Sequence, residues 1–253
     1  MQLIDTHAHI YLPEFDNDRV NIIENARMEG IDLIFMPAID SKTHEAMIEL
    51  EQQYSSCKSM MGLHPCSILD KNEEELNIVE QWLSKRKFIA IGEIGLDFYW
   101  DRTFIDQQYN TFHHQIGLAI NHRLPIVIHS RNAIDECIGV IKQYPGLTGV
   151  FHCFSGNLHQ AEQIIQNGFL LGIGGVVTYK NAGLDKVIQH ISLNSLVLET
   201  DAPYLAPVPF RGKRNESSYL TYIAKKMAGI TNKQMEEVAL VTTQNAMKLF
   251  KLP

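Results

Sequence analysis

The chain has 253 residues, a formal net charge of −7 at pH 7 and a hydrophobic fraction of 45%. This length fits one large domain or two small ones, and the hydrophobic fraction is ample for a sizeable core. The acidic balance disfavours a protein whose whole surface binds nucleic acid. Because no signal-peptide pattern, membrane-length apolar run or Cys-x-x-Cys pair is present, we expect a cytoplasmic protein with reduced thiols and no membrane contact.

Short apolar runs alternate with helix-like stretches along the chain. Strands are expected at 1–5, 31–36, 58–62, 87–93, 125–129, 147–152, 168–174 and 195–200. Helices are expected at 17–29, 41–53, 72–86, 103–121, 132–143, 157–166, 182–190, 217–228 and 232–250. Strands that alternate with helices predict a parallel sheet, and nearly continuous apolar strands predict that both of its faces are covered.

The number of strand–helix units indicates the architecture. Eight such units in about 250 residues match an α/β fold of the (β/α)₈ TIM-barrel type. An open, doubly wound sheet is the alternative that the same pattern allows. Since we find no internal repeat, low-complexity segment or linker, we expect residues 1–253 to form a single domain.

Several of the apolar runs end in, or are followed by, a side chain that can bind a metal ion. These side chains are His7, His9, His64, Glu93, His129, His152 and Asp201. The C-terminal ends of barrel strands converge on one rim, where catalytic residues collect. A lone histidine at a strand end is usually structural, but so many coincidences predict a single site at this rim. The other histidines fall mostly in expected helices and are interpreted as surface or packing residues.

Four of the imidazoles and the two carboxylates make a mixed set of nitrogen and oxygen ligands. Such a set suits Zn²⁺ or Mn²⁺ better than Ca²⁺. It exceeds the needs of one catalytic zinc, which predicts two ions. Glu93 is the expected bridge, since a carboxylate can bind one ion through each oxygen. Two ions about 3.5–4 Å apart can activate water and stabilise a displacement at phosphorus.

Basic residues after two of the strands admit two interpretations. Arg131 follows the fifth expected strand, and the run from Arg211 to Arg214 follows the eighth. Each is either part of a solvated loop or a contact for phosphate at the rim. We expect Arg131, Arg211 and Arg214 to bind substrate.

Two further segments admit a structural and a functional reading. Phe98, Tyr99 and Trp100 follow the fourth expected strand and could stack a base, but buried packing within the loop is favoured. The glycine-rich stretch 171–175 lacks the lysine of a P-loop and the spacing of a dinucleotide-binding loop. We interpret it as a place of tight packing or close approach in the barrel.

Seven short motifs occur in a specific order along the chain. They are "DTHAH", "GLHP", "GEIGLDFY", "IHSR", "FHCFSG", "ETDAPYLAP" and "RGKRNE". In this order they resemble the TatD-type deoxyribonuclease family of the amidohydrolase superfamily, from residue 3 to residue 250. The resemblance implies a distorted (β/α)₈ barrel and a metal-dependent hydrolase. Ser217 stands where the family usually has proline, and we expect it to cap the same helix turn.

The resemblance also implies roles for individual residues. His7, His9, Glu93 and Asp201 would bind one ion, and Glu93, His129 and His152 would bind the second. The ions would be Zn²⁺, Mn²⁺ or Mg²⁺, with Glu93 and Asp201 as the catalytic carboxylates. His64 would line the pocket and contact the phosphate.

The expected activity is 3′→5′ exonuclease action on single-stranded or frayed DNA, with no obligate protein partner. Two alternatives stay open from the sequence. The first is a hydrolase of another ester, such as an aminoacyl-tRNA or a phosphomonoester, because the ligand set does not separate phosphate from acyl chemistry. The second is a metal-binding scaffold without catalysis.

Overall fold

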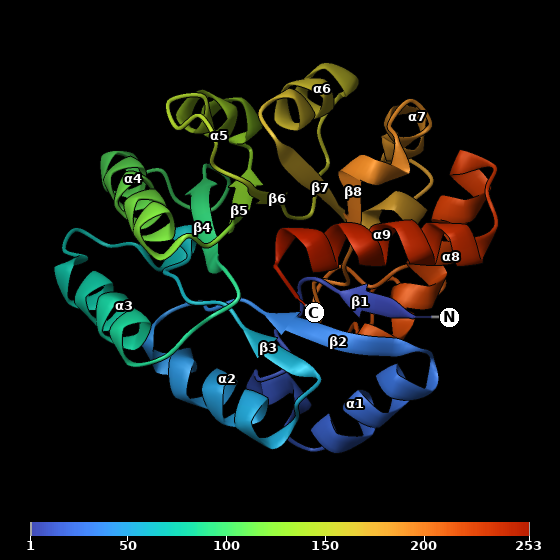
Figure 1. Ribbon diagram of the computed structural model, residues 1–253, viewed down its shortest axis with the longest axis horizontal. Coiled ribbons are helices and arrows are strands. Elements are labelled where there is room, and N and C mark those ends of the chain that lie inside the picture. Colours follow the sequence, from blue (N-terminus) through green and yellow to red (C-terminus); the bar gives the residue numbers. More distant parts are fainter. Residues whose placement is uncertain (1, 253) are drawn as a thin grey trace.

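The computed structural model describes residues 2–252 and contains a ring of parallel strands with helices outside it (Figure 1). The strands are β1 (Leu3–Asp5), β2 (Ile31–Met36), β3 (Cys57–Ser59), β4 (Ile91–Asp97), β5 (Ile126–Arg131), β6 (Gly149–Phe151), β7 (Phe169–Ile173) and β8 (Leu196–Leu198). The α-helices are α1 (Arg19–Met28), α2 (Ser41–Gln53), α3 (Glu73–Lys85), α4 (Ile105–His122), α5 (Ile134–Ile141), α6 (Leu158–Gln166), α7 (Leu184–Ile188), α8 (Leu220–Thr231) and α9 (Met235–Leu249).

The strands form two sheets that meet at two seams. Strands β1 to β3 make one sheet, and strands β4 to β8 make the other, each in chain order. Ala8 pairs with Ala202 across one seam, and Met61 pairs with Ile91 across the other. Both pairings are parallel, like the rest of the ladder. The ring is therefore a distorted (β/α)₈ barrel, and the alternative of an open, doubly wound sheet is wrong.

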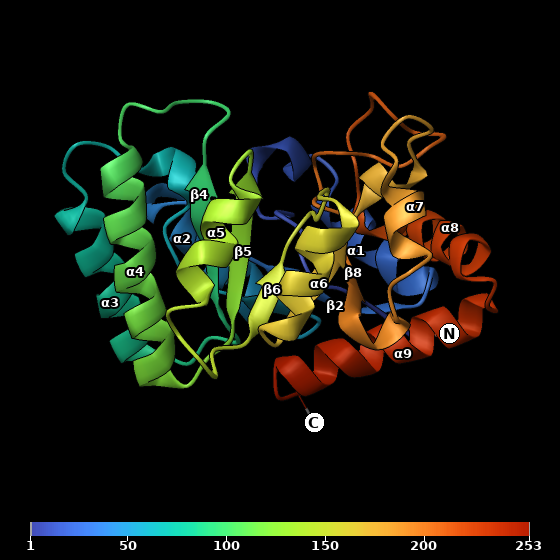
Figure 2. The same ribbon diagram turned by 90° about the horizontal axis from the view of Figure 1, so that it is seen from above.

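An apolar cluster fills the inside of the ring. Its members from the strands and the residues next to them are Ile4, Phe35, Met60, Ala90, Val127, Val150, Leu170 and Val197. Residues from six strands, and from positions next to β3 and β4, can meet in one cluster only inside the barrel. Phe250, at the end of α9, joins them and packs edge-on against Phe35 with 4.8 Å between ring centroids. Helix α9 thus closes one end of the barrel, opposite the loops that follow β4 and β8 (Figure 2).

A second, larger apolar cluster lies between the strands and the surrounding helices. The strands are buried on this outer face too, which explains their continuous apolar runs. Local sequence fixes where some of the covering helices begin. Asn157 starts α6 with a capping box, in which its side chain accepts from the Gln160 N–H and Gln160 reaches back to the Asn157 N–H. Asp40 caps α2 in the same manner with Thr43.

Most expected elements are confirmed, and the helix expected at 41–53 coincides with α2. The clearest difference is β4, which was expected to end at Glu93 and instead runs on to Asp97. Pairing with β5 extends it, and Gly95 permits this close approach, since a Cβ there would lie 2.1 Å from the His129 carbonyl oxygen. Of the first expected strand, residue 1 lies outside the described part of the chain.

The predicted capping role of Ser217 is wrong. Ser217 lies in a 3₁₀ turn before α8, and its buried hydroxyl caps no helix. The expectation of free thiols is confirmed for all four cysteines. No helix within residues 2–252 is long and apolar enough to cross a bilayer.

Replacing Phe250 by alanine should lower the free energy of unfolding by about 3–5 kcal/mol, because it leaves a cavity at the closed end of the barrel. Denaturant titration followed by circular dichroism measures the loss. Leu240→Ala is the matched control, since Leu240 lies in the same helix and is 57% exposed. A change of less than about 1 kcal/mol for Phe250→Ala would contradict the assignment of this residue to the barrel interior.

Candidate metal centre

The inward-facing sides of the strands change from apolar to polar at one end of the barrel. His129 comes two residues after Val127 in β5, and His152 comes two residues after Val150 of β6. Residues two apart in a strand face the same side, so both imidazoles point into the barrel above its apolar filling. The polar side chains therefore meet at the end opposite α9, as the sequence predicted.

Glu93 lies at the centre of these side chains and is almost fully buried. Its Oε2 atom is 3.1 Å from His7 Nε2 and 3.6 Å from His9 Nε2. Its Oε1 atom is 2.7 Å from His129 Nδ1 and 3.1 Å from His152 Nε2. The two oxygens of one carboxylate thus face two different pairs of imidazoles. Burial alone would raise the pKa of Glu93, but the surrounding histidines hold it well below its usual range.

Asp201 completes the group around His7 and His9. Its Oδ1 atom lies 3.8 Å from the Nε2 atom of each histidine. The seam between β1 and β8 fixes its place, because the Asp201 N–H donates to the His7 carbonyl at 2.9 Å. Burial raises the pKa of Asp201 to about 7. We call His7, His9, Asp201 and Glu93 Oε2 the first group, and His129, His152 and Glu93 Oε1 the second group.

In the second group, an acceptor holds the far nitrogen of each imidazole. His152 Nδ1 lies 3.1 Å from Glu199 Oε1, and His129 Nε2 lies 2.8 Å from Asp97 Oδ2. With a cation bound beside Glu93, the proton of each neutral imidazole would lie on the nitrogen that faces Glu199 or Asp97, and the lone pair of the other nitrogen would point toward the cation. Carboxylates that fix imidazoles in this way are typical of metal sites.

Positive charge is also attracted into the second group when it holds no ion. Burial by itself would lower the pKa of His152, but Glu93 and Glu199 raise it well above its usual value. Hydrogen bonds to Asp97 and Glu93 likewise outweigh burial and raise the pKa of His129. A metal ion that binds to these nitrogens must therefore displace protons.

The first group presents neutral imidazoles instead. Burial lowers the pKa of His7 to about 4 and that of His9 well below its ordinary range. The Tyr11 hydroxyl donates to the Pro37 carbonyl at 2.6 Å, so its oxygen accepts from His9 Nδ1 at 3.0 Å. His9 then points the lone pair of Nε2 at Glu93 and Asp201. This set of nitrogen and oxygen donors, close together and buried, fits a divalent transition-metal ion.

Three supporting residues were missed by the sequence reasoning: Asp97, Glu199 and Tyr11. Asp97 was placed beyond its strand, because β4 was expected to end too early. Glu199 carried a usable signal, since it comes two residues after the inward-facing Val197 and so faces the barrel interior. Tyr11 stands in the same alternating series as the two N-terminal histidines.

The glycine-rich stretch makes room for Glu199, which confirms its interpretation as a place of close approach. A Cβ on Gly172 would lie 2.3 Å from Glu199 Oε2 and 3.1 Å from His152 Cα. Glu199 Oε1 also accepts from the Cys153 N–H at 2.6 Å. Its Oε2 is buried and has no hydrogen-bond partner within residues 2–252. Glu199 is therefore held by its backbone surroundings and by the space that Gly172 leaves.

His64 lies at the edge of the second group. Its Nε2 is 3.4 Å from Glu93 Oε1 and 3.3 Å from His129 Nδ1, while its Nδ1 accepts from the Cys66 N–H at 3.0 Å. Neutral His64 consequently carries its proton on Nε2 and presents a donor to the site. The Cys66 thiol is close by, and the ligand atoms of His64, Cys66 and His129 all lie within 4.8 Å of one another.

The three predicted substrate-binding arginines differ in their surroundings. Arg131 is exposed at the end of β5, and its guanidinium lies 3.8 Å from the centroid of the Tyr99 ring. Arg211 is exposed too and lies 4.4 Å from the Tyr179 ring. Both can reach a ligand at the rim.

Arg214 is engaged by the protein itself. Its guanidinium pairs with both carboxylate oxygens of Asp18, donates to the Glu14 carbonyl at 2.6 Å and lies over the Phe15 ring. These contacts tie the loop after β8 to the start of α1. They favour a structural role for Arg214 over the predicted contact with phosphate.

The expected burial of the aromatic loop after β4 is wrong for two of its three residues. Tyr99 and Trp100 are 52% and 69% exposed, whereas Phe98 packs against the core. The physical reason is Asp97, whose Oδ1 accepts from the backbone N–H groups of Tyr99 and Trp100. This turn directs the two rings away from the interior.

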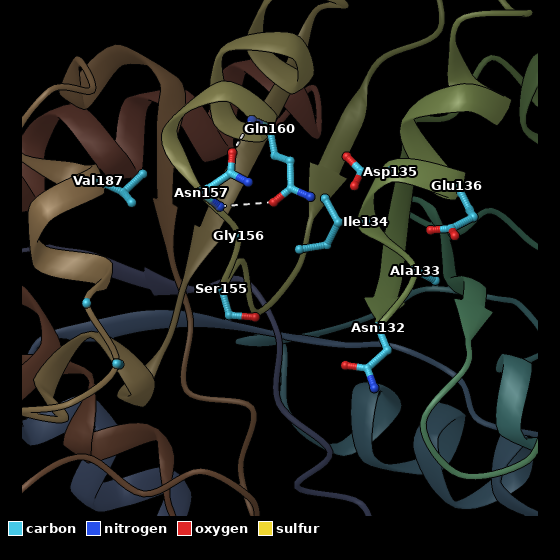
Figure 3. A pocket seen from close by; sticks show the side chains of 12 residues that line it. Asn132, Ala133, Ile134, Asp135, Glu136, Ser155, Gly156, Asn157, Gln160 and Val187 are labelled. Atoms are coloured by element: carbon cyan, nitrogen blue, oxygen red, sulfur yellow. Dashed lines mark hydrogen bonds between the residues drawn. The ribbon is translucent and has the colours of Figure 1, made fainter.

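A polar cleft of about 600 Å³ opens between the segments that follow β5, β6 and β7. Asn132 and Ser155 line it just after β5 and β6, and Asp135 and Asn157 line it at the starts of α5 and α6 (Figure 3). Asn132 directly follows Arg131. The residues that line this cleft belong to neither the first nor the second group, so the cleft lies apart from the metal-binding side chains.

Known proteins resemble the chain over nearly its whole length. The family model described as TatD related DNase matches residues 4–251. The metal-dependent hydrolase YabD of Bacillus subtilis is 38% identical, with 99% of each chain covered. The 3′-5′ ssDNA/RNA exonuclease TatD of Pectobacterium atrosepticum is 28% identical, with 99% of this chain and 100% of that protein covered. The crystal structure of YjjV, a TatD homolog of Escherichia coli, superposes with a TM-score of 0.94 at 31% identity, covering 99% of this chain and 98% of that one.

Replacing Gly172 by alanine should weaken metal binding by about 10–100-fold, because the new methyl group displaces Glu199 from His152. Titration of the apo-protein with Zn²⁺ against a competing chelator measures the affinity. Gly117→Ala is the matched control, because a Cβ there meets no atom within 4 Å and α4 should gain stability. Unchanged affinity in Gly172→Ala would show that Glu199 does not support the site.

Proposed function

Since the chain belongs to the TatD-related DNase family of metal-dependent hydrolases, we propose that it removes nucleotides from the 3′ end of single-stranded or frayed DNA. The observation that carries the proposal is the position of the Glu93 carboxylate, because its two oxygens face separate groups of imidazoles. The relative named as a 3′-5′ ssDNA/RNA exonuclease supports the direction and the substrate class.

We assign one divalent ion to each group, with Glu93 shared between them. The first group supplies two neutral imidazoles and the Asp201 carboxylate, and the second supplies the imidazoles of His129 and His152. The ligand atoms of His7, His9 and Asp201 all lie within 4.8 Å of one another, as do those of His7, Glu93 and His152. The donor set suits Zn²⁺ or Mn²⁺, and Mg²⁺ is the remaining candidate.

Two ions bound there supply Lewis-acid activation of water and stabilise negative charge on phosphate oxygens. Asp201 is the carboxylate suited to take a proton from the attacking water. It is more accessible to water than Glu93, since the two residues are 8% and 2% exposed. His64 is suited to donate from Nε2 to a phosphate oxygen, because its other nitrogen is already an acceptor.

The charge of the site explains why rim residues matter for binding. The two ions would bring a charge of +4, which Glu93, Asp97, Glu199 and Asp201 would balance if all four carboxylates were ionised. Attraction for a phosphodiester chain then depends on cationic and donor groups around the centre. Arg131 and His64 are placed for this role. The remaining surface, which is acidic, adds little attraction for phosphate.

Glu93→Gln should lower kcat by at least about 100-fold and reduce bound metal from two equivalents toward one. The amide keeps the size of the side chain but loses the charge and one anionic oxygen, which typically costs several kcal/mol of transition-state stabilisation. Metal analysis and steady-state rates measure both effects. Glu80→Gln is the control, because this exposed carboxylate pairs with His114 on the outer helices. If the variant kept two bound ions and a tenth of the activity, the assignment of Glu93 as the bridging ligand would be wrong.

The activity itself is tested with a 5′-labelled single-stranded oligonucleotide, incubated with the Mg²⁺-, Mn²⁺- or Zn²⁺-loaded protein. We expect a ladder of products that shortens from the 3′ end, and slower trimming of a blunt duplex. Internal cuts without end trimming would contradict the exonuclease assignment. Hydrolysis of an aminoacyl-tRNA or a phosphomonoester, without cleavage of DNA under any of these conditions, would move the function to another ester.

A further inference from the structure

Two aromatic rings stand exposed on the rim of the barrel, in the loop after β4. Tyr99 and Trp100 are 52% and 69% exposed and pack edge to face, with 5.0 Å between ring centroids. The Arg131 guanidinium lies 3.8 Å from the centroid of Tyr99 and 5.1 Å from that of Trp100. Large aromatic side chains left in water forgo their burial free energy, and a cluster of them marks a binding surface.

The loop that carries these rings is tied to the metal centre by a single carboxylate. Asp97 Oδ1 accepts from the N–H groups of Tyr99 at 2.9 Å and Trp100 at 3.1 Å. Asp97 Oδ2 faces His129 Nε2 at 2.8 Å. The same side chain therefore orients a metal-facing imidazole and sets the position of both rings. Such a connection holds a ligand on the rings in a fixed relation to the reacting centre.

Arg131 is fixed by the same strand pair. It lies opposite Asp97 in the register of β4 and β5, and its carbonyl accepts from the Phe98 N–H at 3.0 Å. Its position two residues after His129 places a permanent positive charge beside the second group. Flat π-faces next to a guanidinium match a nucleotide, which presents a flat base and an anionic phosphate.

We propose that Tyr99, Trp100 and Arg131 form a nucleotide subsite, in which an unpaired base near the reacting phosphate stacks on the aromatic rings while Arg131 holds a neighbouring phosphate. The inference rests on the proposed function and names the feature that selects single strands. In a duplex the faces of the bases are covered by their neighbours, so only an unpaired or terminal base can stack on the rings. Stacking of this kind tolerates every base.

The first experiment measures binding without turnover. The chain has two tryptophans, and Trp82 lies on α3, where Lys85 covers its ring. Trp82→Phe leaves Trp100 as the sole tryptophan, and we expect its fluorescence to fall when a single strand with phosphorothioate linkages is added. The matched control Trp100→Phe retains Trp82, whose fluorescence should not change. A strand that binds without quenching Trp100 would overturn the subsite.

The second experiment measures cleavage of oligonucleotides that lack one base at successive positions from the 3′ end. With the wild-type protein, removal of the base at one particular position should lower kcat/KM by about 10–100-fold, which is the effect expected for the loss of one stacked base. Trp100→Ala should lose the same factor on the intact strand and lose nothing more on the abasic one. Trp100→Phe should keep most of the activity, because phenylalanine can still stack. If Trp100→Ala and the missing base each lowered kcat/KM, and the two losses multiplied when combined, the subsite would be overturned.

The two experiments separate this inference from the proposed function. Normal cleavage of every abasic strand would overturn the subsite and leave the exonuclease assignment standing. If the wild-type protein cleaves no DNA, the exonuclease assignment fails, and the fluorescence of Trp100 decides the subsite. Quenching by the single strand would then support a nucleotide subsite, and its absence would overturn it. The fluorescence experiment uses the intact Trp100 ring, so it does not depend on whether Trp100→Ala folds.

Discussion

The contact on which the rest of the site depends is the carboxylate of Glu93 between two groups of imidazoles. One oxygen faces His7 and His9, and the other faces His129 and His152. A buried carboxylate keeps its negative charge only where positive charge or hydrogen-bond donors compensate for the lost hydration. Here that charge comes from protons on the histidines or from bound cations. The other polar groups of the barrel rim are arranged around this requirement.

A layer of acceptors behind the imidazoles makes the arrangement specific. Glu199 and Asp97 each hold the far nitrogen of one histidine in the second group, and Tyr11 holds that of His9. With a cation bound, the proton of each of these three imidazoles would lie on the nitrogen that faces its acceptor, and the nitrogen that faces Glu93 would be free to act as a ligand. Gly172 belongs to this layer through the space that it leaves for Glu199.

The two ends of the barrel have different roles, one in stability and the other in metal binding. At one end, α9 and Phe250 cover an apolar filling drawn from six strands and from residues next to β3 and β4. At the other end, the same inward-facing strand positions carry the metal-binding side chains, and the loops after β4 and β8 surround them. The apolar layer beneath the site strengthens its electrostatic interactions, because it keeps the local dielectric low. The asymmetry of the ring thus places a polar centre on a rigid apolar base.

The sequence by itself determined the barrel and the rim, because both follow from patterns within single segments. Alternating apolar runs and helical stretches predicted the (β/α)₈ order, and the histidines at the ends of the runs predicted where the site lies. Only the tertiary structure decided which side chains each of these residues contacts. Asp97 reaches His129 through strand pairing, Glu199 reaches His152 across β7, and Arg214 pairs with Asp18 from the opposite end of the chain. Strand periodicity fixes which way a side chain faces along its own strand. Which groups it meets depends on how distant strands close the ring, and no local pattern encodes that closure.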